Sequence, residues 1–138
     1  DFSLDRELNK KVFLIKLTPG LNPDIFDMLL NMNYKGIIIE AFGAGGIHFI
    51  RRDLISKLRE TVESGISVVV CSQCLYESSN FSIYQTGKRA LKTGVIQALD
   101  MTTEATVTKL MWALGKTSSQ NEIKNIFNTN FAGEISLI

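Results

Sequence analysis

Reactive side chains in this chain follow short apolar segments, and a cysteine pair has the most specific spacing among them. Cys71 and Cys74 form a C-x-x-C pair, the spacing of thiol–disulfide redox sites. Such a site normally lies at the N-terminus of a helix, which lowers the thiol pKa, but no helix signal follows this pair. The sequence holds no second Cys/His pair to complete a zinc site. We therefore expect structural thiols in a reducing cytoplasm, with redox activity or ligand contact by Cys74 as alternatives.

An acidic residue, Glu40, stands near the end of the apolar run GIIIEAF. A carboxylate in such a run is costly unless it is paired or lies at the open edge of a sheet. Two interpretations follow. Glu40 is either a hydrogen-bonded acid at a strand end, or a group that binds a ligand amine or a neighbour's cation.

A glycine-rich loop follows the same run and contains Gly43 and Gly45. It does not complete the dinucleotide pattern G-x-G-x-x-G, because His48 occupies the position of the third glycine. We expect a tight turn that allows close approach of another chain or a ligand. His48 is the single histidine, and no serine or cysteine nucleophile is paired with it. We interpret His48 as a loop or interface residue, with ligand contact as the alternative.

A longer loop, residues 73–86, mixes aromatic residues such as Tyr76 and Tyr84 with polar ones. Loops of this composition commonly form interfaces or lids, so we expect a subunit or domain interface, with a packed surface loop as the alternative. Ser72 precedes it, without a G-x-S-x-G elbow or a paired base. Asp100 and Glu104 are better explained by helix capping than by acid–base catalysis. No motif indicates a metal or a cofactor, and we predict none.

The elements that carry these residues are short apolar strands alternating with amphipathic helices. We predict strands over 11–17, 36–42, 66–71 and 95–96. Helices are predicted after Asn22, over 51–64 with Gly65 as cap, around 87–93, after Thr102, and after Ser119. This alternation indicates an α/β fold in which helices cover both faces of a parallel sheet of about four strands.

Right-handed crossovers would place every strand-to-helix loop at one edge of this sheet, where ligands bind in open α/β folds. The segments expected there are Thr18–Asn22, Glu40–Phe49, Ser72–Gln85 and Ala98–Thr103.

Apolar spacing also predicts which helix faces are buried. Ile25, Met28, Leu29 and Met32 mark the face of the first helix, and Val107, Leu110, Met111 and Leu114 that of the helix after Thr102, which Gly115 is predicted to end. Trp112 falls outside the second group, so we expect it in the core on another face of that helix or at an interface.

Composition limits the functional classes. The chain has 138 residues, a formal net charge of +1, 45% apolar residues and 21% charged residues, as in one ordinary globular domain. The near-zero charge gives no reason to expect nucleic acid or an anionic membrane as partner. Apolar runs such as Val12–Ile15 are too short to span a bilayer.

Several blocks, taken in order, resemble the C-terminal domain of bacterial type I L-asparaginases. They are Thr18-Pro19-Gly20, GIIIEAFGAGG, the VVV run that ends at Cys74, Tyr84-Gln85-Thr86-Gly87, GVIQALDMTTEATVTKLMWALGK and NFAGEIS. The resemblance covers roughly residues 11–136. It implies a flavodoxin-like three-layer domain, with residues 1–10 as the end of an interdomain linker and 11–138 as the C-terminal domain.

The resemblance also implies a function. Such enzymes hydrolyse L-asparagine to aspartate and ammonia through a threonine nucleophile on a larger N-terminal domain. The TGGT-like and GTDT-like motifs of that domain are not in this sequence. We therefore expect this chain to be inactive alone, and to contact its own N-terminal catalytic domain and a neighbouring subunit of a homo-oligomer, either a dimer or a tetramer.

Some members of this family bind L-asparagine as an effector in this domain. Ser72 and Cys74 match the positions of a hydroxyl residue and a cysteine there, but Glu40 stands where some members have an arginine. A glutamate would repel the substrate carboxylate. Two alternatives remain open: the amidase subunit of a glutamyl-tRNA amidotransferase, whose C-terminal segments share the Lys109–Trp112 style of helix, and a stand-alone small-ligand-binding module.

Overall fold

A computed structural model describes residues 8–18, 20–41, 52–71, 88–98, 100–131 and 133–135. The strands are β1 (Val12–Lys16), β2 (Gly36–Glu40), β3 (Ser67–Cys71) and β4 (Ile96–Gln97). The helices are α1 (Asp24–Asn31), α3 (Arg52–Glu63), α5 (Thr103–Lys116) and α6 (Gln120–Phe127), and residues 88–91 form a short helix between β3 and β4. The predicted alternation of strands and helices is confirmed.

The four strands form one parallel sheet in the order β1-β2-β3-β4. In this register Lys16 pairs with Glu40, and Glu40 pairs with Cys71. Chain order and spatial order are therefore the same, and the described strands contain no reversal of order that would create a ligand crevice between two of them.

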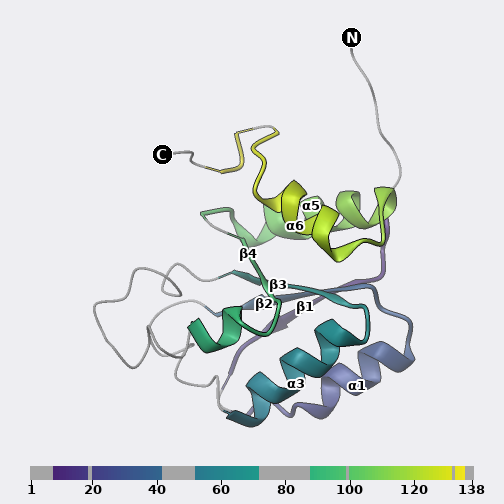
Figure 1. The fold of residues 1–138 in the computed structure, drawn as a ribbon, viewed down its shortest axis with the longest axis vertical. Helices are drawn as coiled ribbons and strands as arrows, with labels where there is room; N and C mark the ends of the chain where they lie inside the picture. Colours follow the sequence, from purple (N-terminus) through teal and green to yellow (C-terminus); the bar gives the residue numbers. More distant parts are fainter. Residues whose placement is uncertain are drawn as a thin grey trace.

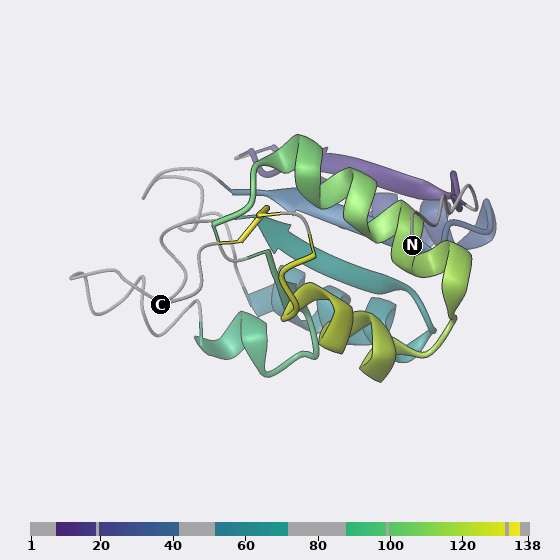
Figure 2. The same ribbon diagram turned by 90° about the horizontal axis from the view of Figure 1, so that it is seen from above.

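Helices cover both faces of the sheet, as expected (Figures 1 and 2). α1 and α3 lie on one face, where Phe26, Leu58 and the odd-numbered side chains of β2 form one core. α5 and α6 lie on the other face, where Ile38, Val69, Leu110 and Phe127 belong to a second core. The described part of the chain is thus a three-layer α/β domain, and none of its helices is long and apolar enough to cross a membrane.

The predicted buried face of α1 is wrong in part. Met28 and Met32 are 61% and 55% exposed, whereas Phe26 is 1% and Leu29 is 3% exposed. α1 has eight residues and rests on the sheet through Phe26 and Leu29, three residues apart, so the face opposite Phe26 turns to solvent. Met32 lies beyond the last residue of the helix.

Two helix boundaries show how local chemistry sets the ends. Thr102 caps α5 as predicted, since its hydroxyl accepts from the backbone N–H of Ala105 at 3.1 Å. The prediction that Gly115 ends this helix is wrong: α5 continues through Lys116 and ends at Thr117, which is extended and donates its N–H to the carbonyl of Ala113. A glycine inside a helix costs about 1 kcal/mol, which the packing of α5 outweighs.

Gly65 does terminate α3 as predicted. Its φ is 102°, a left-handed conformation that glycine adopts without strain. The Gly65 N–H donates to the carbonyl of Val62, and the Ile66 N–H donates to that of Thr61. These are the two bonds of a Schellman motif, which turns the chain directly into β3.

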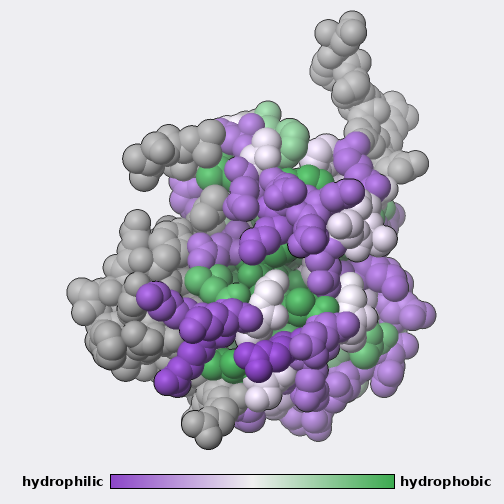
Figure 3. Space-filling model, in the orientation of Figure 1, coloured by the Kyte–Doolittle hydropathy of each residue, from purple (hydrophilic) through white to green (hydrophobic). Residues whose placement is uncertain are grey.

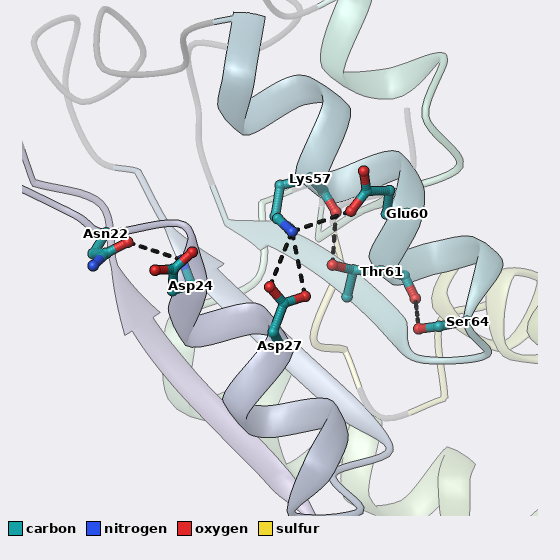
Figure 4. A network of polar contacts seen from close by, with 7 residues as sticks. All are labelled: Asn22, Asp24, Asp27, Lys57, Glu60, Thr61 and Ser64. Atoms are coloured by element: carbon teal, nitrogen blue, oxygen red, sulfur yellow. Dashed lines mark hydrogen bonds and ion pairs between the residues drawn. The ribbon is translucent and has the colours of Figure 1, made fainter.

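A polar network joins α1 to α3 on the solvent side (Figure 4). The Lys57 ammonium lies 3.1 Å from Asp27 Oδ2 on α1 and 3.1 Å from Glu60 Oε2 on its own helix. Hydrogen bonds to Asp27 and Glu60 raise the pKa of Lys57. Just before α1, the Asn22 side chain accepts from the N–H of Asp24, whereas the N-cap of the helix is Pro23, which makes no side-chain cap bond.

Gly36, the first residue of β2, lets α5 approach the sheet closely. A Cβ atom at this position would lie 2.7 Å from Leu110 Cδ2 and 2.8 Å from Leu114 Cδ1. Leu110 is fully buried, so it has little room to move aside. Any side chain at position 36 would push α5 away from β2.

We therefore expect Gly36→Ala to lower the free energy of unfolding by about 1–3 kcal/mol through overpacking. Urea denaturation measures the change. Gly20→Ala is the matched control, because a Cβ there meets nothing within 4 Å. Equal stability of the two variants would contradict this account of how α5 packs.

Candidate functional site

The edge where the strands end is the candidate ligand-binding edge, and its described part is a row of three side chains. Lys16, Glu40 and Cys71 are neighbours in register on β1, β2 and β3. Side chains alternate along a strand, and Ile38 and Val69 belong to the core under α5, so all three positions face α5. Glu40 is half-buried, and an opposite charge, Lys16, stands beside it in register; both interpretations of this carboxylate stay predictions.

Cys71 is the buried member of this row, with 1% of its surface exposed. Burial raises the pKa of its thiol, and the nearby carboxylates of Glu40 and Glu104 add to the rise. The Thr106 hydroxyl beside the thiol acts in the opposite direction. Because the thiolate is the nucleophile, a buried thiol with a raised pKa is unreactive at neutral pH. The structural interpretation of this thiol is therefore the one that its surroundings favour.

Two threonines in the first turns of α5 are also committed to structure. The Thr106 hydroxyl donates to the carbonyl of Thr102 at 2.8 Å, and the Thr108 hydroxyl donates to that of Glu104 at 3.1 Å. A threonine nucleophile needs a base beside its hydroxyl, whereas these hydroxyls bond to helix carbonyls. Glu104 lies in the first turn of α5, as expected for a residue that complements the helix dipole.

Most of the predicted site residues lie outside the described residues. These are Gly43, Gly45, His48, Ser72, Cys74, Tyr76 and Tyr84. Their roles stay predictions, and so does the interface assigned to the loop 73–86. Among the described residues, no group of three or more His, Cys, Asp and Glu side chains is placed to hold a metal ion.

The predictions from sequence missed a buried ion pair on the outer side of α5. Lys109 Nζ lies 2.7 Å from Glu134 Oε1, with side chains only 7% and 14% exposed. The same ammonium donates to the carbonyl of Thr129 and lies 5.6 Å and 5.4 Å from the ring centroids of Phe127 and Phe131. Glu134 also accepts from the backbone N–H of Phe131. Lys109 therefore fastens the segment after α6 to α5.

Trp112 lies in a groove beside this pair and belongs to neither core. Its ring meets that of Phe131 edge to face at 5.2 Å, and the Lys116 ammonium lies 4.8 Å from its centroid. The groove has a volume of about 650 Å³ and is largely apolar, with Leu8 and Phe131 among its walls. Trp112 is thus half-buried and outside both cores, so the expectation that it lies in the core is wrong, and its place at an interface stays a prediction.

Removing one partner of the buried pair should be costly. We expect Glu134→Gln to lower the free energy of unfolding by about 3 kcal/mol, because it leaves the Lys109 charge buried and unpaired. The double variant Lys109→Met/Glu134→Gln should be more stable than the single one. Urea denaturation of both, with the exposed Glu63→Gln as control, decides the point; additive losses would contradict it.

The raised pKa of Cys71 predicts how stability changes with pH. Below about pH 8.5 both folded and unfolded thiols hold their proton, so the contribution is fully present. As the pH rises further, the unfolded thiol ionises first and stability falls, by at most about 1.4 kcal/mol per pH unit. Cys71→Ala should remove this part of the slope, whereas Cys74→Ala serves as the comparison. Urea denaturation from pH 7 to 10 measures it, and identical slopes would contradict the assignment.

The chain is similar in sequence to one protein family and to several of its members. A family model described as the glutaminase/asparaginase C-terminal domain matches residues 11–127. An L-asparaginase of Thermococcus kodakarensis is 46% identical over 132 residues, which is 96% of this chain and 40% of that protein. A subunit of the glutamyl-tRNA(Gln) amidotransferase of Pyrococcus abyssi is 40% identical over 136 residues, which is 99% of this chain and 30% of that protein.

Solved structures agree with this assignment. The thermostable L-asparaginase from Thermococcus kodakarensis superposes with a TM-score of 0.79 at 45% identity, over 96% of this chain and 40% of that one. L-asparaginase I from Vibrio cholerae gives a TM-score of 0.71 at 28% identity, over 92% of this chain and 38% of that one. The chain spans less than half the length of each of these relatives. With its three layers, its parallel sheet and its match over residues 11–127, the chain belongs to the glutaminase/asparaginase C-terminal domain family.

Proposed function

We propose that this chain is the smaller, non-catalytic domain of an L-asparaginase, an enzyme that hydrolyses L-asparagine to L-aspartate and ammonia. The observation that carries the proposal is the state of the nucleophile candidates at the strand ends. Thr106 and Thr108 donate to helix carbonyls, and the thiol of Cys71 is buried and protonated. The described residues at this edge support a wall or an interface, with the reaction carried out on another domain.

The assembly we propose is a homo-oligomer in which this domain contacts its own catalytic domain and a neighbouring subunit. Exposed apolar side chains on and beside α1, Met28, Leu30 and Met32, offer an apolar surface for such contact. Glu40 would repel a substrate carboxylate, so an effector site built on an arginine at that position is not part of the proposal.

The alternative is the amidase subunit of a glutamyl-tRNA amidotransferase, and a specific observation keeps it open. Curated subunits of that kind are 38–42% identical to this chain, close to the 46% of an L-asparaginase. The formal net charge of +1 favours the enzyme that acts on a free amino acid, because binding to tRNA phosphates relies on excess Lys and Arg.

An ammonia-release assay on two proteins tests the proposal. The product of the full reading frame that contains this chain should release ammonia from free L-asparagine without tRNA or a second subunit. The 138-residue chain alone should release none above the uncatalysed rate, because the hydroxyls of Thr106 and Thr108 bond to helix carbonyls and the Cys71 thiol is buried with a raised pKa. Turnover by the chain alone at a rate comparable to the full protein would refute the non-catalytic role. Co-purification with a second subunit that delivers ammonia to tRNA-bound glutamate would favour the alternative.

A further inference from the structure

The groove beside Trp112 exposes apolar side chains that belong to neither core. Leu8 and Phe131 line it and are 48% and 57% exposed, and Trp112 in the same wall is half-buried. Its two buried charges, Lys109 and Glu134, are already paired with one another, so they do not call for a charged ligand. Contiguous exposed apolar surface with polar residues at its margin marks an interaction site.

The groove lies against one face of α5. On the face drawn in Figure 3, hydrophilic residues cover most of the outer side of α6 and of α3. The groove is formed instead by Ala105, Thr108 and Trp112, which recur at helical spacing and therefore share one face of α5. The segment before β1 contributes Leu8 to the wall, and the segment after α6 contributes Phe131.

A hydrogen bond holds the segment before β1 at this groove. The Asn9 N–H donates to the carbonyl of Met111 on α5 at 2.9 Å, and the Asn9 side chain accepts from the N–H of Lys11 at 2.9 Å. Leu8, the residue before this anchor, is itself part of the groove wall. Any domain that precedes this segment in the full protein is therefore tethered within a few residues of the groove.

Tethering favours such a domain over other occupants. The relatives described above are longer than this chain, which spans 40% of one L-asparaginase, and the family model that it matches from residue 11 is that of a C-terminal domain. A domain joined by a short tether has an effective concentration of about 1 mM at the groove. A second copy of the protein reaches that level only when its concentration in solution is equally high.

We propose that the groove over Trp112 receives apolar side chains of the domain that precedes this one in the full protein, and so forms the contact between the two domains. The inference rests on the proposed function, which supplies that domain. Trp112 and Phe131 are the anchors of the contact, because aromatic side chains in a desolvated pocket carry much of the binding energy of an interface. Glu104, exposed and also in the wall, belongs to the polar rim that such contacts have.

Thiol labelling at position 108 tests the proposal. Thr108 is exposed and lines the groove, whereas Asn125 is exposed on α6, outside the described lining. Thr108→Cys and Asn125→Cys are made in the 138-residue chain and in the product of the full reading frame, and maleimide incorporation is located by peptide mass spectrometry. We expect labelling at position 108 to be about tenfold slower in the full protein, the factor that 1.4 kcal/mol of domain contact gives. Labelling at position 125 should proceed at equal rates in both.

A charge placed in the wall separates contact at the groove from other causes of protection. Leu8→Asp should restore fast labelling at position 108 in the full protein, because a buried unpaired carboxylate opposes the contact. Asn125→Asp, which adds the same charge on α6, should leave that labelling slow. Equal rates at position 108 in the full protein and in the chain alone would overturn the proposal. Protection that disappears on dilution to single subunits would overturn it too, because the occupant would then be a second copy.

Ammonia release from L-asparagine by the same full-length variants keeps this inference distinct from the proposed function. An active protein that is labelled at position 108 as fast as the chain alone contradicts only the placement of the domain contact. A protein that is protected at position 108 but releases no ammonia contradicts only the proposed reaction.

Discussion

The structure depends on one constraint: the two central strands must be covered on both faces. All five residues of β3 are buried, and in β2 only Glu40 is not fully buried. The central strands of such a parallel sheet are apolar on both faces, so helices must cover both faces to keep water away. α1 connects β1 to β2 and α3 connects β2 to β3, and these two crossover helices form the first layer. The second layer comes from α5 and α6, which follow the last strand and pack back across the sheet.

That second layer is held by unusually specific contacts. Gly36 admits Leu110 and Leu114 at a distance that any Cβ would prevent. On the far side of α5, Lys109 is nearly buried and is satisfied by the carboxylate of Glu134 and the carbonyl of Thr129. The ion pair thus joins two of the blocks that resemble the family, the one that contains Lys109 and the one that contains Glu134. Its role is to hold the segment after α6 in place, because desolvation offsets much of the attraction between the charges.

The two edges of the sheet differ in chemistry for physical reasons. At the strand ends, Glu40 and Glu104 lie near one another with Lys16 beside Glu40 in register, and burial raises the pKa of the Cys71 thiol. At the strand starts, the described wall that contains Ser67, Gln120 and Lys124 carries one charge, that of Lys124, and lies at the N-terminus of α6. α5 and α6 run in opposite directions over the sheet, and each brings its N-terminal dipole to a different edge.

The sequence by itself determined the layers, the order of elements, the family and most of the caps, because apolar periodicity and capping are local properties. Thr102 and Ser119 cap the starts of α5 and α6, and Gly65 ends α3, as the sequence predicts. Tertiary structure alone decided the buried face of α1, the passage of α5 through Gly115, and the pairing of Lys109 with Glu134 across 25 residues. Burial and pairing of this kind depend on which surfaces meet in space, and a periodic pattern along one helix does not contain that information.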